Sequence, residues 1–135
     1  MALKVGDLAT FSKTITDDDI RQFADLVLDH NPVHLDDEFA KKTRFGRRIA
    51  HGMLGASLIS ATIGNKLPGP GTIYLGQNLQ FVEPFFPGDT ITAKVTVIKI
   101  REDKPIVTLE TVCSNQNGNT VIKGEAVVLV ERINE

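Results

Sequence analysis

A carboxylate and an imidazole lie close together in the segment Asp29-His30-Asn31-Pro32-Val33-His34, where Asp29 and His34 are five positions apart. Proline fixes its own φ and disfavours helical backbone for the residue before it, so the chain should bend at Asn31-Pro32. Both side chains can then point into one small space, as an acid–base pair acting on a single water molecule requires. The alternative is structural: Asp29 caps a turn and His34 lies on the surface.

A second candidate is Gly52, which follows His51 at the predicted start of a long apolar helix. The first amides of a helix have no partner within it, so such an N–H can stabilise a developing negative charge. Glycine also lets a ligand approach the main chain closely. Spacing alone leaves two roles open for Gly52, an oxyanion donor or a contact that permits tight packing. For His51 a structural role is favoured over a catalytic one.

Two predicted helices position these residues. The first begins after Thr16, which can act as its cap, and the three carboxylates of 17–19 favour its positive end. Apolar residues at helical spacing continue to Leu28, and this helix should end before Asn31. The second helix runs from His51 to about residue 65 and is apolar on nearly all sides, which is typical of a buried helix. A short helical turn is expected at 37–42.

The chain after Pro70 is predicted to form strands, with a further short strand or extended lead-in at 5–11. Alternating apolar residues and turn signals indicate strands at 79–82, 91–97, 106–113 and 120–130, and Asn117-Gly118 marks a hairpin. Helices followed by a run of antiparallel strands indicate an α+β fold with the helices on one face of the sheet. A length of 135 residues suits one domain, spanning 1–135.

Bulk composition argues against several classes of function. A net charge of −2 favours neither nucleic acid nor a membrane surface as the main partner. The longest mostly apolar run, 53–63, is shorter than the ~20 residues of a membrane span. The N-terminus shows no signal-peptide pattern. Cys113 is the sole cysteine, so no internal disulfide can form, which fits a reducing compartment. The cytoplasm is the default expectation, and a mitochondrial protein trimmed of its transit peptide is the alternative.

Five basic residues fall within eight positions between the two predicted helices, and His30 and His34 are four positions apart. The basic run is either a solvated face or a landing site for the phosphates of coenzyme A or of acyl carrier protein. No metal site is expected, because Pro32 disrupts the helical face that would bring the two histidines together. The basic residues are Lys41, Lys42, Arg44, Arg47 and Arg48.

The segment 29–36 resembles the hydratase-2 signature of the MaoC-like family. The resemblance extends from about residue 5 to about residue 130 and includes His51-Gly52-Met53-Leu54, 71–77, 101–106 and 124–128. The order and spacing of these motifs are most similar to the short, single-domain (R)-specific enoyl-CoA hydratases that supply polyhydroxyalkanoate synthesis. The resemblance implies a hot-dog fold, in which an antiparallel sheet wraps around a central buried helix.

The resemblance also implies roles for individual residues. Asp29 and His34 would activate the water that adds across a 2-enoyl thioester, and the Gly52 amide would stabilise the enolate. His30 departs from the aromatic or apolar residue expected at its position. The resemblance also places four residues beside the substrate. Asn31 chiefly fixes the bend, Ser60 lines the site near the catalytic pair, and Ile63 and Val128 shape the acyl pocket.

The implied activity is the reversible hydration of trans-2-enoyl-CoA to (R)-3-hydroxyacyl-CoA by a homodimeric lyase. No cofactor would take part, because coenzyme A is only the handle of the substrate. The alternatives are a 3-hydroxyacyl-[acyl-carrier-protein] dehydratase, a hot-dog acyl-CoA thioesterase in which attack falls on the carbonyl carbon, and a non-enzymatic acyl-binding subunit. The spacing of Asn31-Pro32 and His34 favours the hydratase over the thioesterase.

Overall fold

One antiparallel sheet of six strands forms the body of the protein in a computed structural model that describes residues 2–131. Along the sheet, the strands follow the order β1 (Leu8–Thr14), β4 (Thr90–Ile100), β5 (Ile106–Ser114), β6 (Thr120–Val130) and β2 (Thr72–Gln77). The two-residue strand β3 (Gln80–Phe81) also pairs with β6, so β2 and β3 share one neighbour.

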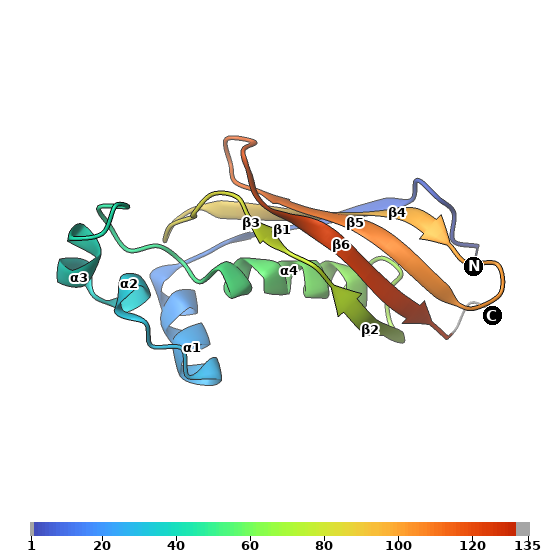
Figure 1. Ribbon diagram of the computed structural model, residues 1–135, viewed down its shortest axis with the longest axis horizontal. Helices are drawn as coiled ribbons and strands as arrows, with labels where there is room; N and C mark the ends of the chain where they lie inside the picture. Colours follow the sequence, from blue (N-terminus) through green and yellow to red (C-terminus); the bar gives the residue numbers. More distant parts are fainter. Residues whose placement is uncertain (1, 132–135) are drawn as a thin grey trace.

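Helix α4 (Gly52–Asn65) lies lengthwise against one face of this sheet, which is the hot-dog arrangement (Figure 1). Its side chains Leu58 and Ile59 join the core formed by the inward-facing residues of the strands, such as Val95 and Leu109. An ideal Cβ at Gly55 would lie 2.7 Å from the Phe85 ring, so only glycine permits this helix to pack so closely. No helix among residues 2–131 is long and apolar enough to cross a bilayer.

Three further helices gather at one end of the sheet (Figure 1): α1 (Asp17–Val27), α2 (Pro32–Leu35) and α3 (Asp37–Lys41). The N-terminus of α1 is fixed by a capping box, in which Thr16 accepts from the Asp19 amide and the Asp19 carboxylate accepts from the Thr16 amide. The predicted caps and the predicted end of this helix before Asn31 are confirmed.

Two strands differ from the prediction made from pattern alone. Val5 and Gly6 form a turn, with φ +99° at Gly6, so β1 begins at Leu8. The first strand after Pro70 is β2, whereas the predicted strand at 79–82 is reduced to the two residues of β3. Strand β2 lies at an edge of the sheet and is mostly exposed, so its sequence lacks the alternation of a half-buried strand. The family resemblance did indicate it.

Candidate active site

The bend after α1 is built from two helix caps. Leu28 ends α1 in the left-handed region, at φ 64°, and its amide and that of Asp29 both donate to the Ala24 carbonyl. Asn31 then caps α2, because its side-chain oxygen accepts from the Val33 amide at 3.1 Å. Pro32 occupies the first position of α2, where no N–H is needed. The predicted bend is therefore also the start of a helical turn that the sequence analysis missed.

His34 lies on α2 and is 9 % exposed. Its Nδ1 atom is 2.8 Å from the main-chain carbonyl oxygen of Ile49. A carbonyl can only accept, so we assign the ring proton to Nδ1. The neutral ring then presents an unprotonated Nε2, which can accept a proton from water. The surface position considered as an alternative for His34 is wrong.

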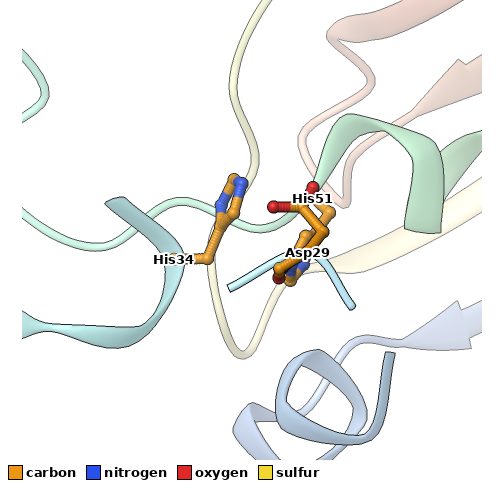
Figure 2. A group of neighbouring side chains, drawn as sticks. All are labelled: Asp29, His34 and His51. Carbon is orange, nitrogen blue, oxygen red and sulfur yellow. Dashed lines mark hydrogen bonds between the residues drawn. The ribbon is translucent and has the colours of Figure 1, made fainter. Parts of the chain in front are cut away.

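The Asp29 carboxylate lies beside this ring. One of its oxygens, Oδ1, accepts from the Asn31 amide at 3.2 Å, which fixes the carboxylate within the turn. One carboxylate oxygen of Asp29 and one ring nitrogen each of His34 and His51 all lie within 4.8 Å of one another (Figure 2). Two acceptors that each lie about 2.8 Å from one water are roughly 4.4–4.9 Å apart. The structure therefore brings Asp29 and His34 close enough for one water to contact both.

His51 is the third member of this group and is 2 % exposed. Its ring stacks on His34 with a centroid separation of 3.9 Å and an interplanar angle of 29°. Its Nε2 lies 3.1 Å from the carbonyl oxygen of Asp29, so Nε2 carries the proton. Burial lowers the pKa of His51, and the ring stays neutral. In the sequence, only the position of His51 beside Gly52 suggests that it belongs to the site, since its contact partners lie far away along the chain.

Gly52 is the first residue of α4 and lines a cavity of about 350 Å³ together with His34. Its amide has no acceptor within the helix, because the helical pattern leaves the first four N–H groups unpaired. An ideal Cβ at Gly52 would lie 2.7 Å from the ring of Phe81, another residue of the cavity wall. Both roles left open for Gly52 thus have structural support, a free amide and a close packing contact.

A second pocket, of about 520 Å³, borders the first, because Met53 lines both. Ser60 lines this second pocket, together with Tyr74 and Gln77, which the sequence analysis did not single out. The Tyr74 hydroxyl donates to Gln77 Oε1 at 2.6 Å. Burial raises the pKa of Tyr74 to about 12, so the hydroxyl stays protonated and acts as a polar group of the pocket wall.

Ile63 and Val128 do not line either of these pockets. They are 2 % and 0 % exposed and belong to the closed core between α4 and the sheet. Val128 lies on β6, between β5 and β2, with its side chain turned inward. Their contact with a substrate stays a prediction, as does that of Asn31, whose side chain serves as the cap of α2.

The basic run separates into residues with different surroundings. Arg48 is structural: it donates to the carboxylates of Asp17 and Asp37 and to the His34 carbonyl, and so ties α1, α2 and α3 together. Lys41 pairs with Glu38 at 3.3 Å, and Arg47 lies over the Phe86 ring. Arg44 lines the cavity that contains His34 and Gly52.

Among the described residues, Asp29, His34 and His51 form a group of three side chains that could bind a metal ion. The nitrogens left without a carbonyl partner are His34 Nε2 and His51 Nδ1. A metal lies in the plane of each imidazole that binds it, about 2 Å from the nitrogen. Rings stacked at 3.9 Å with a tilt of 29° do not direct their lone pairs to one such point. The geometry suits a shared water better than a shared ion.

Comparison with known proteins gives matches along nearly the whole chain. Residues 6–121 match the model of the MaoC like domain. An (R)-specific enoyl-CoA hydratase of Rhodospirillum rubrum is 48% identical over 128 residues, which cover 95% of this chain and 88% of the relative. One of Aeromonas caviae is 51% identical over 127 residues, covering 94% and 95%. A solved A. caviae structure, described as an (R)-hydratase involved in PHA biosynthesis, has a TM-score of 0.93 and 50% identity, covering 96% and 98%.

Proposed function

Because the chain belongs to the MaoC-like family, we propose that it is an (R)-specific enoyl-CoA hydratase, a lyase that reversibly adds water to trans-2-enoyl-CoA to give (R)-3-hydroxyacyl-CoA. One observation carries the proposal. A carboxylate oxygen of Asp29 and a ring nitrogen of His34 lie within 4.8 Å of each other, close enough for one water molecule to contact both, and the Ile49 carbonyl occupies His34 Nδ1. His34 also lines the same cavity as Gly52, the first residue of the buried helix.

The chemistry follows from this arrangement. A water that donates one hydrogen to each acceptor turns its lone pair toward the substrate, where it can attack the β-carbon. As the new C–O bond forms, the π electrons of the double bond move to the α-carbon, and negative charge develops on the thioester oxygen. The Gly52 amide stabilises that charge. The Asp29–His34 pair takes a proton from the water and returns one to the α-carbon, so that one H₂O is added in all.

The proposal includes no cofactor. A base, an acid and an oxyanion donor are sufficient to add water to a conjugated thioester, and Asp29, His34 and Gly52 supply all three. Arg44 at the cavity wall supports a substrate that carries phosphates, as coenzyme A and the arm of acyl carrier protein both do. The cytoplasm is the proposed location, on the ground that Cys113, the only cysteine, is a buried free thiol.

We also propose a homodimer, on the basis of the edge of the sheet. Strand β2 pairs only with β6 among the described strands, which leaves its outer side open. Apolar side chains are exposed on it and near it, including Ile73, Leu75 and Phe81, at 49%, 53% and 51%. A two-fold axis beside β2 would bury this surface against its own copy. Sedimentation analysis tests this: a monomer at micromolar concentration would rule the dimer out.

The activity is tested by incubating the purified protein with crotonyl-CoA. Hydration removes the absorbance of the conjugated double bond and leaves the thioester intact, and chiral analysis should find (R)-3-hydroxybutyryl-CoA. Release of free thiol with the double bond unchanged would instead identify a thioesterase. Binding without turnover would identify an acyl-binding subunit. Faster turnover of the acyl carrier protein thioester than of the coenzyme A thioester would indicate the dehydratase.

A further inference from the structure

His51 contacts each of the groups to which the proposed chemistry is assigned. Its Nε2–H donates to the Asp29 carbonyl at 3.1 Å, and its ring lies 3.9 Å from the ring of His34. Its peptide bond supplies the amide of Gly52, and its own carbonyl accepts from the Leu54 amide at 3.1 Å, in the first turn of α4. Figure 2 shows its ring gathered with the two acid–base side chains.

The ring of His51 has little freedom to move. The ring of Phe23, on α1, meets it edge to face at 5.0 Å and 64°, while His34, on α2, covers one of its faces. The side chain is 2 % exposed. It is therefore clamped between two helices and can act as a fixed support for the turn that carries Asp29.

The Nδ1 atom of His51 lowers the stability of the folded state. It is buried and has no hydrogen-bond partner among residues 2–131. A buried polar atom without a partner loses its hydration and gains nothing in return. A phenylalanine would fill much the same space without that penalty, so packing alone does not explain a histidine here. The Nε2–H contact with the Asp29 carbonyl is what an apolar ring could not supply.

We propose that His51 is a positioning residue, which holds Asp29 through its Nε2–H and supports the His34 ring through stacking. The inference rests on the function proposed above. It adds that a neutral imidazole, which takes no part in proton transfer, fixes the relative position of the two proton acceptors. A shift of Asp29 by about 1 Å would be enough to lower turnover strongly, since reaction rates depend steeply on the position of reacting groups.

Two variants separate the two contacts. His51→Phe keeps a flat ring against His34 and Phe23 but removes the hydrogen bond to the Asp29 carbonyl. His51→Gln keeps an N–H donor near the position of Nε2 but removes the ring. The matched control is His30→Gln, because the His30 ring is exposed and contacts Asp25 at 3.0 Å instead. For each variant, kcat and KM with crotonyl-CoA are measured together with the melting temperature.

The expected result is a fall in kcat of about tenfold or more in each His51 variant, with KM within about threefold of the parent. His51→Phe should melt close to the parent, because the removal of a buried unpaired acceptor offsets the loss of the hydrogen bond to the Asp29 carbonyl. His30→Gln should stay within about twofold in kcat. A purely structural histidine predicts that activity falls only as far as the folded fraction does, and that result would overturn the proposal. A kcat for His51→Phe within threefold of the parent would also overturn it.

If a variant does not fold, the tautomers of His51 and His34 can be measured on the unmodified protein. Nitrogen-15 NMR of the histidine side chains at pH 7 distinguishes the two neutral tautomers. The proposal requires the Nε2–H form at His51 and the Nδ1–H form at His34. An Nδ1–H form at His51 would overturn it. This readout is independent of turnover, so failure of the positioning role and failure of the proposed activity can be told apart.

Discussion

The Nδ1–H of His34 donates to the main-chain carbonyl of Ile49, 2.8 Å away. This contact fixes the tautomer of the ring and leaves Nε2 as an acceptor beside the Asp29 carboxylate. Ile49 is held in turn, because its amide donates to the Val33 carbonyl at 3.2 Å. The loop before α4 and the helix α2 therefore orient the imidazole from both sides, before any substrate binds.

Removing either member of the pair should abolish most turnover. We expect Asp29→Asn and His34→Ala each to lower kcat at least about a hundredfold, the usual contribution of a positioned acid or base. Circular dichroism provides the control for folding. Near-parental activity in a well-folded variant would remove that residue from the mechanism.

The Gly52 amide can be tested with a pair of substitutions that differ in one N–H. Gly52→Ala and Gly52→Pro both add a Cβ against the Phe81 ring, but only proline removes the amide. Proline is tolerated at the first position of a helix, and His51 before it has extended backbone, with ψ 128°. We expect kcat for Gly52→Pro to lie about a hundredfold or more below that of Gly52→Ala. Equal values would assign Gly52 to packing alone.

Arg48 should stabilise the protein in a pH-dependent way. Its hydrogen bond, followed by that of Arg21, holds the pKa of Asp17 below its usual value. A carboxylate whose pKa is depressed in the folded state stabilises that state above its unfolded pKa, about 3.9. This stabilisation is lost as the pH falls through the folded pKa.

Arg48→Met should therefore lower the free energy of unfolding at pH 7 by about 1–2 kcal/mol. Below about pH 4, the stability of this variant should fall less steeply than that of the parent. Urea denaturation at pH 7 and pH 3 measures both effects. Arg21→Met is the control, since the exposed Arg21–Asp17 pair within α1 should contribute only about 0.3–0.5 kcal/mol. Equal acid sensitivity of parent and Arg48→Met would contradict the assignment.

Arg44 should matter only for substrates that carry phosphates. It lines the cavity with His34, and it makes no ion pair within the described part of the chain. We expect Arg44→Gln to raise KM for crotonyl-CoA about five- to tenfold, as for loss of one charged contact. KM for the phosphate-free N-acetylcysteamine thioester should not change. Lys41→Gln, which removes a charge outside the cavity, should leave both values unchanged.

Local rules predicted the elements that have strong sequence signals. Thr16 and the acidic residues after it fix the start of α1, and the continuous apolar run after Gly52 fixes α4. Helix α2 was missed because Asn31-Pro32 signals both a bend and a helix start, and a four-residue turn has no periodicity to tell them apart. Strand β2 follows no alternation, because its four central residues are all exposed and select for no regular apolar face.

The candidate site was predicted in part. Asp29 and His34 are close in sequence, so the bend between them could be inferred. The role of His51 could not, because its three partners, Phe23, Asp29 and His34, come from other elements. The basic run was also ambiguous: only the folded structure shows that Arg48 is occupied by carboxylates while Arg44 borders the cavity.

Helix α4 lines both the cavity that contains His34 and the pocket that contains Ser60. Helix α4 presents Gly52 at its first turn and Ser60 eight residues later, which corresponds to about 12 Å along the axis. The proposed proton chemistry depends on the first turn, and the neighbouring pocket extends along α4 from Met53 to Ser60. Substitutions around Ser60 can thus alter which acyl chains are accepted without changing proton transfer. Substrate specificity and reactivity can therefore evolve separately.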